Sequence, residues 1–212
     1  MRPVLTPELV LRAYRQGVFP MAESSDGDRL YWFDPEWRGV LPLDGLHLSR
    51  SLRRRIRAEP FRLSLDADFA GVLTGCADRA STWINGGIAE LFTALHDMGH
   101  AHSIEVWEGD DLVGGVYGLA LGGAFCGESM FSRRRDASKI ALATLLTHLR
   151  RCGFTLFDTQ YLTDHLASLG GIEIPRAQYH ARLAAALQAD AAFHRAPLPA
   201  AYDVVQLNTH RS

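Results

Sequence analysis

Two short apolar stretches of the sequence each contain a single acidic residue. Glu128 lies within the apolar run 125–131, and Asp158 follows Leu-Phe at the start of the run 156–160, with Gln160 two residues further on. Burying a carboxylate is costly unless it is paired or hydrogen-bonded. Residues two apart in a strand also share one face of the sheet. We therefore predict that Glu128, Asp158 and Gln160 form a polar site inside an apolar core.

The composition describes an ordinary globular chain. It has 212 residues, of which 47% are hydrophobic and 22% are charged, and its net charge is −2. A chain of this length buries a sizeable core without disulfides or metals, and its overall charge gives no general attraction for nucleic acid. An odd set of three cysteines without CxxC spacing favours a reducing compartment and argues against a zinc site. Without a signal-like or membrane-length apolar run, we expect a cytoplasmic protein that does not associate with membranes.

The periodicity predicts an α/β (α+β) fold in which most strands are antiparallel. Capping residues and apolar spacing predict helices over 7–16, 50–57, 67–76, 88–98, 137–152, 163–168 and 175–189. Alternating or apolar runs predict strands over 30–33, 39–41, 61–65, 102–107, 112–121, 124–131 and 155–158. We expect a small N-terminal domain over 1–80, containing the basic helix, and a catalytic domain over 81–212. The tail over 194–212 is expected to be loosely structured.

The second half of the chain resembles the core of N-acetyltransferase-like domains. Three consecutive strands, a long helix and a further strand follow one another in the order of that fold. Such enzymes usually hold the coenzyme A pyrophosphate on a glycine-rich turn before the long helix. The corresponding segment here, 133–138, contains no glycine, so close approach of its backbone to a pyrophosphate is not expected.

A longer series of motifs resembles one particular family, the bacterial leucyl/phenylalanyl-tRNA–protein transferases. The resemblance covers roughly residues 8–187, and many ordered motifs together are more specific than any single pattern. The matching segments are Gly17–Pro20, Ser49–Ser51, Thr82–Ile84, Ala101–Trp107, Leu112–Gly118, Phe125–Arg133, Ala137–Lys139, Asp158–Gln160, His165–Gly170 and Ile174–Arg176.

The resemblance implies a concrete reaction. The family moves leucine or phenylalanine from an aminoacyl-tRNA to the N-terminal arginine or lysine of a protein, which then carries a destabilising N-terminus for regulated proteolysis. It uses charged tRNA in place of coenzyme A, in agreement with the missing glycine turn, and needs no cofactor. The donor is an ester and the acceptor is an α-amine, whose pKa of about 7.7–8.0 leaves much of it nucleophilic at cellular pH. The enzyme therefore mostly positions its substrates and stabilises charge.

By the same resemblance, three residues carry the chemistry. Gln160 matches the catalytic glutamine beside the attacking amine, and Asp158 matches the aspartate that holds or polarises it. Glu128 matches a pocket glutamate suited to a cationic acceptor. Structural alternatives are that Asp158 caps the following turn and that Glu128 pairs with a core arginine.

The aminoacyl side chain requires an apolar slot. Val116, Phe125, Leu149 and Phe157 match the positions of that slot, although ordinary core packing would give the same pattern. One methylene is worth about 1–3 kcal/mol in such a pocket, so we expect leucine, phenylalanine and methionine to be accepted.

Aromatic stacking is expected to hold the terminal adenosine of the tRNA. Trp83 matches a family tryptophan with this role. Met21 stands where the family has a second aromatic residue, and a thioether would pack more weakly on the base.

A run of arginines is the best candidate for phosphate contacts. Such a run is usually only a solvated helix face, but beside a charged-tRNA site it favours RNA binding without base identity. The arginines are Arg50, Arg53, Arg54, Arg55 and Arg57. By contrast, His96, His100 and His102 lack a carboxylate at ligand spacing, so we expect no metal.

Two other functions stay open at this point. One is a conventional acyl-CoA-dependent N-acetyltransferase, and the other is a non-catalytic RNA-binding module built on the arginine helix. We expect the working unit to be a monomer.

Overall fold

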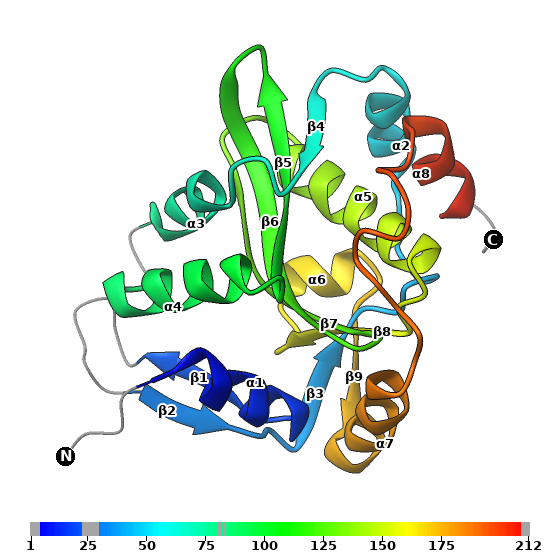
Figure 1. Ribbon diagram of the computed structural model, residues 1–212. Coiled ribbons are helices and arrows are strands. Elements are labelled where there is room, and N and C mark those ends of the chain that lie inside the picture. Colours follow the sequence, from blue (N-terminus) through cyan, green and yellow to red (C-terminus); the bar gives the residue numbers. More distant parts are fainter. Residues whose placement is uncertain (1–4, 23–29, 80–81, 83, 209–212) are drawn as a thin grey trace.

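The computed structural model describes residues 5–22, 30–79, 82 and 84–208 (Figure 1). Its strands are β1 (Phe19–Ala22), β2 (Leu30–Phe33), β3 (Trp37–Val40), β4 (Arg62–Leu65), β5 (Ala101–Glu108), β6 (Asp111–Leu121), β7 (Ala124–Ser132), β8 (Leu156–Gln160) and β9 (Ile172–Pro175). Its helices are α1 (Pro7–Arg15), α2 (Arg50–Arg57), α3 (Phe69–Ala77), α4 (Gly86–Asp97), α5 (Ala137–Arg151), α6 (Asp164–Ser168), α7 (Arg176–Leu187) and α8 (Ala201–Leu207). None of these helices is long and apolar enough to cross a membrane.

Seven strands form one mixed sheet in the order β4-β5-β6-β7-β8-β3-β9. Every neighbouring pair in it is antiparallel except β7 and β8, which run parallel after the long crossover through α5. Parallel neighbours need such a crossover, usually a helix. The predicted fold class is therefore confirmed, including the succession of meander, long helix and further strand.

The parallel pairing of β7 with β8 is short. It joins Ala124–Cys126 to Leu156–Asp158, and β7 then continues to Ser132 without β8 as its partner. The two strands therefore separate beyond Cys126, and this separation leaves space between them near Glu128.

The centre of the sheet is buried on both faces. On one face, α5 packs against β5, β6 and β7 around residues such as Val116 and Phe125. On the other, α1, α3 and α4 enclose a second cluster that contains Tyr117 and Cys126 (Figure 1). Neighbouring residues of β6 and β7 thus enter different cores, as the alternation of side chains along a strand requires. This is why both strands read as nearly continuous apolar runs.

Two elements that the sequence pattern did not reveal complete the edges of the fold. The strand β9 buries only Ile174 and pairs only with β3, so its pattern is too short to stand out. The helix α8 lies in the tail that we expected to be loosely structured, and that expectation is wrong. Its N-cap residue, Ala200, has no side chain that could accept a hydrogen bond, so the sequence shows no signal for the start of this helix. The helix is stabilised by the packing of Val204 and Val205 against the core.

The domain boundary expected at residue 80 falls between strands of one sheet. Strand β4 precedes that boundary and pairs with β5, and β3 also precedes it and pairs with β8 and β9. The N-terminal part also contributes the separate two-stranded sheet of β1 and β2, in which Phe19 pairs with Phe33.

Candidate active site

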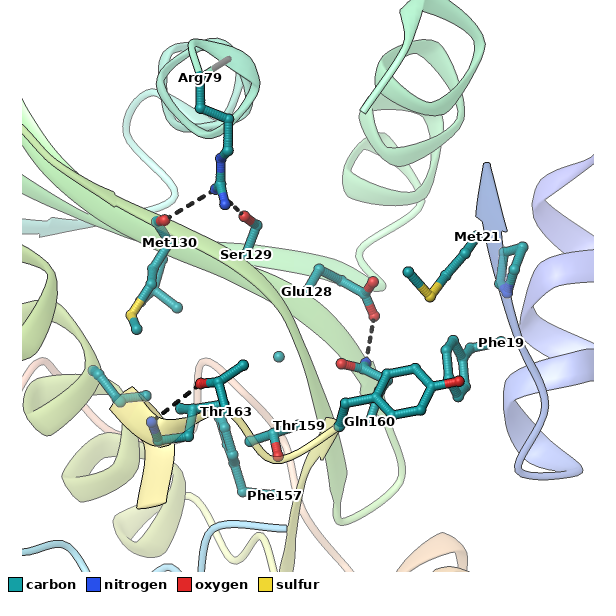
Figure 2. Close-up of a pocket in the computed structure, with 16 residues that line it drawn as sticks. Phe19, Met21, Arg79, Glu128, Ser129, Met130, Phe157, Thr159, Gln160 and Thr163 are labelled. Atoms are coloured by element: carbon teal, nitrogen blue, oxygen red, sulfur yellow. Dashed lines mark hydrogen bonds between the residues drawn. The ribbon is translucent and has the colours of Figure 1, made fainter. Parts of the chain in front are cut away.

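A cavity of about 380 Å³ opens where β7 and β8 separate (Figure 2). One part of its wall is apolar and the other carries the polar side chains that could do chemistry. The apolar lining includes Phe19, Met21, Val116, Met130, Leu142 and Phe157. The polar lining includes Arg79, Glu128, Ser129, Thr159, Gln160 and Thr163. The cavity can therefore receive an apolar side chain and a polar reacting group at the same time.

Among the residues that the structure describes, Glu128 is the only acidic one that lines this cavity. Its Oε1 atom accepts hydrogen bonds from the Tyr14 hydroxyl at 2.9 Å and from Nε2 of Gln160 at 3.2 Å. Burial raises the pKa of Glu128 to about 8, although the hydrogen bond from Tyr14 opposes this rise. A cation bound beside the carboxyl group would favour its ionised form.

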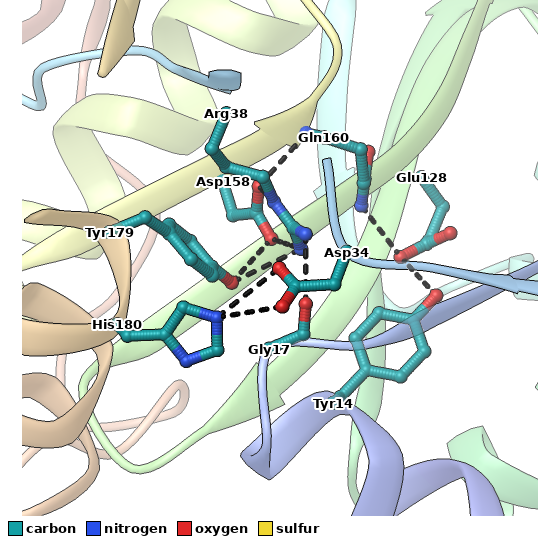
Figure 3. A network of polar contacts seen from close by, with 9 residues as sticks. All are labelled: Tyr14, Gly17, Asp34, Arg38, Glu128, Asp158, Gln160, Tyr179 and His180. Carbon is teal, nitrogen blue, oxygen red and sulfur yellow. Dashed lines mark hydrogen bonds and ion pairs between the residues drawn. The ribbon is translucent and has the colours of Figure 1, made fainter. Parts of the chain in front are cut away.

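Asp158 lies behind the cavity wall in a fully buried ion pair with Arg38 of β3 (Figure 3). The guanidinium donates Nε–H to Oδ1 at 2.8 Å and an Nη2 hydrogen to Oδ2 at 2.7 Å, and Tyr179 donates its hydroxyl to Oδ2 at 2.9 Å. Nη1 of Arg38 also donates to the carbonyl oxygen of Gly17 at 2.8 Å. This is the bidentate geometry that makes arginine–carboxylate pairs strong and rigid.

Two aromatic rings hold the arginine from its faces. The guanidinium carbon of Arg38 lies 4.5 Å from the ring centre of Phe19 and 4.2 Å from that of Tyr179. Burial, with Asp158 close by, raises the pKa of Tyr179, so its hydroxyl stays protonated and keeps donating. The ion pair is therefore fixed by contacts on all sides rather than by charge alone.

Gln160 connects this buried pair to the cavity. Its backbone N–H donates to Oδ1 of Asp158 at 2.9 Å, while its side chain reaches Glu128 (Figure 3). Its φ of 59° lies in the left-handed region, a strained conformation for a residue other than glycine. Gln160 pairs with Gly39 of the neighbouring strand β3. The backbone after Gln160 approaches this position so closely that a Cβ on residue 39 would lie 2.6 Å from the carbonyl carbon of Tyr161, and only glycine leaves room for it.

Family models and curated proteins show which proteins this chain is similar to. The family model described as leucyl/phenylalanyl-tRNA protein transferase matches residues 40–184, and the model of its N-terminal domain matches residues 4–36. A leucyl/phenylalanyl-tRNA–protein transferase of Cereibacter sphaeroides strain ATCC 17025 is 63% identical over 191 residues, covering 90% of this chain and 89% of the relative. One of Roseobacter denitrificans is 57% identical over 208 residues, covering 98% of this chain and 99% of the relative.

The chain belongs to the leucyl/phenylalanyl-tRNA protein transferase family. It is an aminoacyltransferase, as the resemblance of its motifs implied. Among solved structures, that of L-PGS from Bacillus licheniformis matches with a TM-score of 0.40 and 13% identity, covering 71% of this chain and 51% of that one.

In this transferase, the cavity brings together part of the predicted site. Glu128, Gln160, Val116, Phe157 and Met21 all line it. Asp158 does not line it but supports Gln160 from behind. Trp83 lies outside the described residues.

Two residues predicted for the aminoacyl slot, Phe125 and Leu149, do not line this cavity. Both are completely buried in the core. The ring of Phe125 packs among those of Phe154, Phe157 and Phe193. The contribution of α5 to the cavity is Leu142, which lies two turns before Leu149 on the same face of the helix.

The arginine helix α2 is also separate from the cavity, since none of its arginines lines it. Its apolar side packs against α8 through Leu52 and Ile56. Arg53 donates to the carbonyl oxygen of Leu48, and Arg55 lies over the ring of Phe61. Arg50, Arg54 and Arg57 are exposed.

Sequence reasoning missed three residues that shape the site. Arg38 was detectable in principle, because it is a lone charge in a short apolar strand in a chain that buries two acids. Tyr14 on α1 and Arg79 after α3 had no such signal. Arg79 donates to Oγ of Ser129 at 2.7 Å and to the carbonyl oxygen of Met130 at 3.3 Å, at the rim of the cavity (Figure 2).

Proposed function

We propose that this enzyme transfers leucine or phenylalanine, and also methionine, from an aminoacyl-tRNA to the α-amine of a protein that begins with arginine or lysine. The observation that carries the proposal is the pairing of an apolar cavity with the carboxylate of Glu128 at its wall, in a chain of this family. The apolar wall suits side chains without polar groups. The carboxylate of Glu128 suits a cationic acceptor.

The chemistry requires one bond to form and one to break. The α-amine nitrogen attacks the ester carbonyl carbon, a C–N bond forms, and the C–O bond to the terminal ribose breaks. The amine loses a proton, and the ribose oxygen gains one. The pKa of Glu128, about 8, is close to that of a free α-amine, so a proton passes between them at little cost.

Gln160 is placed to orient the reacting groups. Its amide donates to Glu128, and its position is fixed through Asp158 and Arg38. A backbone held in this way favours the precise positioning on which aminolysis of an ester depends. We therefore assign Gln160 and Glu128 to the reacting groups and Asp158 to their support.

Arginine side chains supply the contacts expected for the tRNA. We propose that Arg79, which is exposed and lines the cavity, contacts the 3′ end, and that the exposed Arg50, Arg54 and Arg57 meet phosphates further along the RNA. We also propose a monomer as the working unit. We propose that the reaction takes place in the cytoplasm, where charged tRNA is available.

Transfer of radiolabelled leucine from Leu-tRNA tests this function directly. We expect labelling of a peptide that begins with arginine, much weaker labelling of the same peptide beginning with alanine, and loss of labelling with Asp158→Asn. Asp97→Asn, an exposed acid at the end of α4, is the matched control and should retain activity. No labelling from Leu-, Phe- or Met-tRNA would contradict the proposal, and acyl transfer from acyl-CoA by the same preparation would favour the alternative enzyme class.

Val116→Leu should change the preference between donors. The substitution adds one methylene to the wall of the cavity and should lower transfer of phenylalanine relative to leucine by about tenfold. Competition between Phe-tRNA and Leu-tRNA measures the ratio. Val113→Leu makes the same change in the same strand without lining the cavity, and should leave the ratio unchanged. Equal ratios in the two variants would place the aminoacyl group elsewhere.

A further inference from the structure

A second cluster of chemically capable side chains lies away from the cavity. It contains Asp66 in the turn after β4, His102 of β5 and His194 in the segment between α7 and α8. One ligand atom from each lies within 4.8 Å of the others. None of the three lines the cavity described above, and the transfer reaction leaves them without a role.

The two carboxylate oxygens of Asp66 make different contacts. Its Oδ1 atom accepts the backbone N–H of Ser103 at 2.7 Å, which fixes the orientation of the group. Its Oδ2 atom faces both imidazoles, at 2.8 Å from Nδ1 of His102 and 3.3 Å from Nε2 of His194. A tetrahedral zinc ion with bonds of about 2.0–2.1 Å separates neighbouring ligand atoms by about 3.3 Å. The separation of Asp66 and His194 already has this value, and that of Asp66 and His102 has to increase slightly.

Neighbouring residues and the backbone fix His102 and Asp66 in place, whereas His194 is accessible to solvent. His102 is buried, and its ring is stacked on that of Phe193 with the centres 4.0 Å apart. Asp66 has a φ of 53°, a left-handed conformation that directs its side chain from the turn. The side chain of His194 is 63% exposed, so an ion and a water ligand can reach the cluster from solvent.

We propose that Asp66, His102 and His194 bind a divalent transition-metal ion of the zinc class, with water as the remaining ligand. Two imidazoles and one carboxylate suit zinc, and three protein ligands with one open position are a common zinc arrangement. Coordination through Nδ1 of His102 uses the tautomer with its hydrogen on Nε2, so the ion replaces the hydrogen bond that joins this ring to Asp66. The bound ion would attach the segment before α8 to the sheet.

Calorimetric titration of the chelator-stripped protein with zinc chloride tests the site. The wild type should bind one equivalent and gain thermal stability, because an ion that binds only the folded state raises its melting temperature. His194→Ala removes the most exposed ligand and should weaken binding at least tenfold without affecting folding. His47→Ala, which removes an exposed histidine outside the cluster, should bind like the wild type. The three cysteines are buried and would not compete for the ion.

The ring nitrogen resonances of the histidines give a second readout. Zinc should shift the signals of His102 and His194 together and leave that of His47 in place. Equal affinities of the wild type and His194→Ala, or ring signals of the cluster that do not move, would overturn the proposal. The cluster would then serve only as a set of polar contacts that joins the segment before α8 to the sheet.

Discussion

Replacing Arg38 with leucine should lower the free energy of unfolding by about 3–5 kcal/mol and stop aminoacyl transfer. The change leaves the carboxylate of Asp158 fully buried without its cation. Tyr179 still donates to Oδ2, but one neutral donor does not replace a bidentate guanidinium. The backbone of Gln160 loses its fixed support at the same time, because that support is Oδ1 of Asp158. Denaturant unfolding measures the first effect, and the labelled-leucine assay measures the second.

Two further variants separate charge from packing. Removing both charges, with Arg38→Leu and Asp158→Leu together, should restore much of the stability but not the activity, because no buried charge is then unpaired. Arg133→Leu removes an exposed arginine that pairs with Asp78 at 3.3 Å, and should cost less than about 1 kcal/mol. If Arg38→Leu cost no more than Arg133→Leu, the buried pair would have no part in holding the site.

The second large effect concerns Glu128 and pH. Its pKa in the folded protein, about 8, is above the ordinary value of 4.5, so the folded state retains a proton that the unfolded chain releases. The contribution of this protonation to the free energy of unfolding is fully present below about pH 4.5 and is lost as the pH rises through about 8. Glu128→Gln does not titrate. The stability of the wild type relative to the variant should therefore fall between pH 5 and pH 9, by on the order of 3 kcal/mol.

Unfolding of both proteins at several pH values measures this difference, and all other titrating groups cancel in the comparison. Parallel stability curves would show that Glu128 ionises with its ordinary pKa. In the transfer assay, the variant should also discriminate at least tenfold less between peptides that begin with arginine and with alanine, because its neutral amide no longer attracts a cation. Unchanged discrimination would assign acceptor recognition to another residue.

The sequence predicted the central elements of this fold well because their patterns are strong. The long apolar period of α5 and the nearly continuous apolar runs of β5, β6 and β7 each extend over many residues. Glu128 and Gln160 were found because a polar residue in an apolar strand is unusual. The partner of Asp158 was missed because β3 joins β8 across a gap of more than a hundred residues, and nothing in either strand encodes that order.

The apolar wall of the cavity shows a different limit of prediction from sequence. Leu142 and Leu149 occupy the same face of α5 and have the same pattern, yet only Leu142 reaches the cavity. The difference depends on where β7 and β8 separate, which is set by the tertiary structure. Phe125 does not line the cavity for the same reason, because it lies where the two strands are still paired.

The separation of β7 and β8 also has a consequence for how this enzyme can change. The hollow results from the path of the main chain, so its existence does not depend on small side chains around it. In the function proposed above, substitutions at Met130 or Leu142 would alter which amino acid fits while the pairing of Ala124–Cys126 with β8 stays intact. Homologues with this fold can therefore differ in donor preference through single substitutions, and each intermediate sequence keeps the fold.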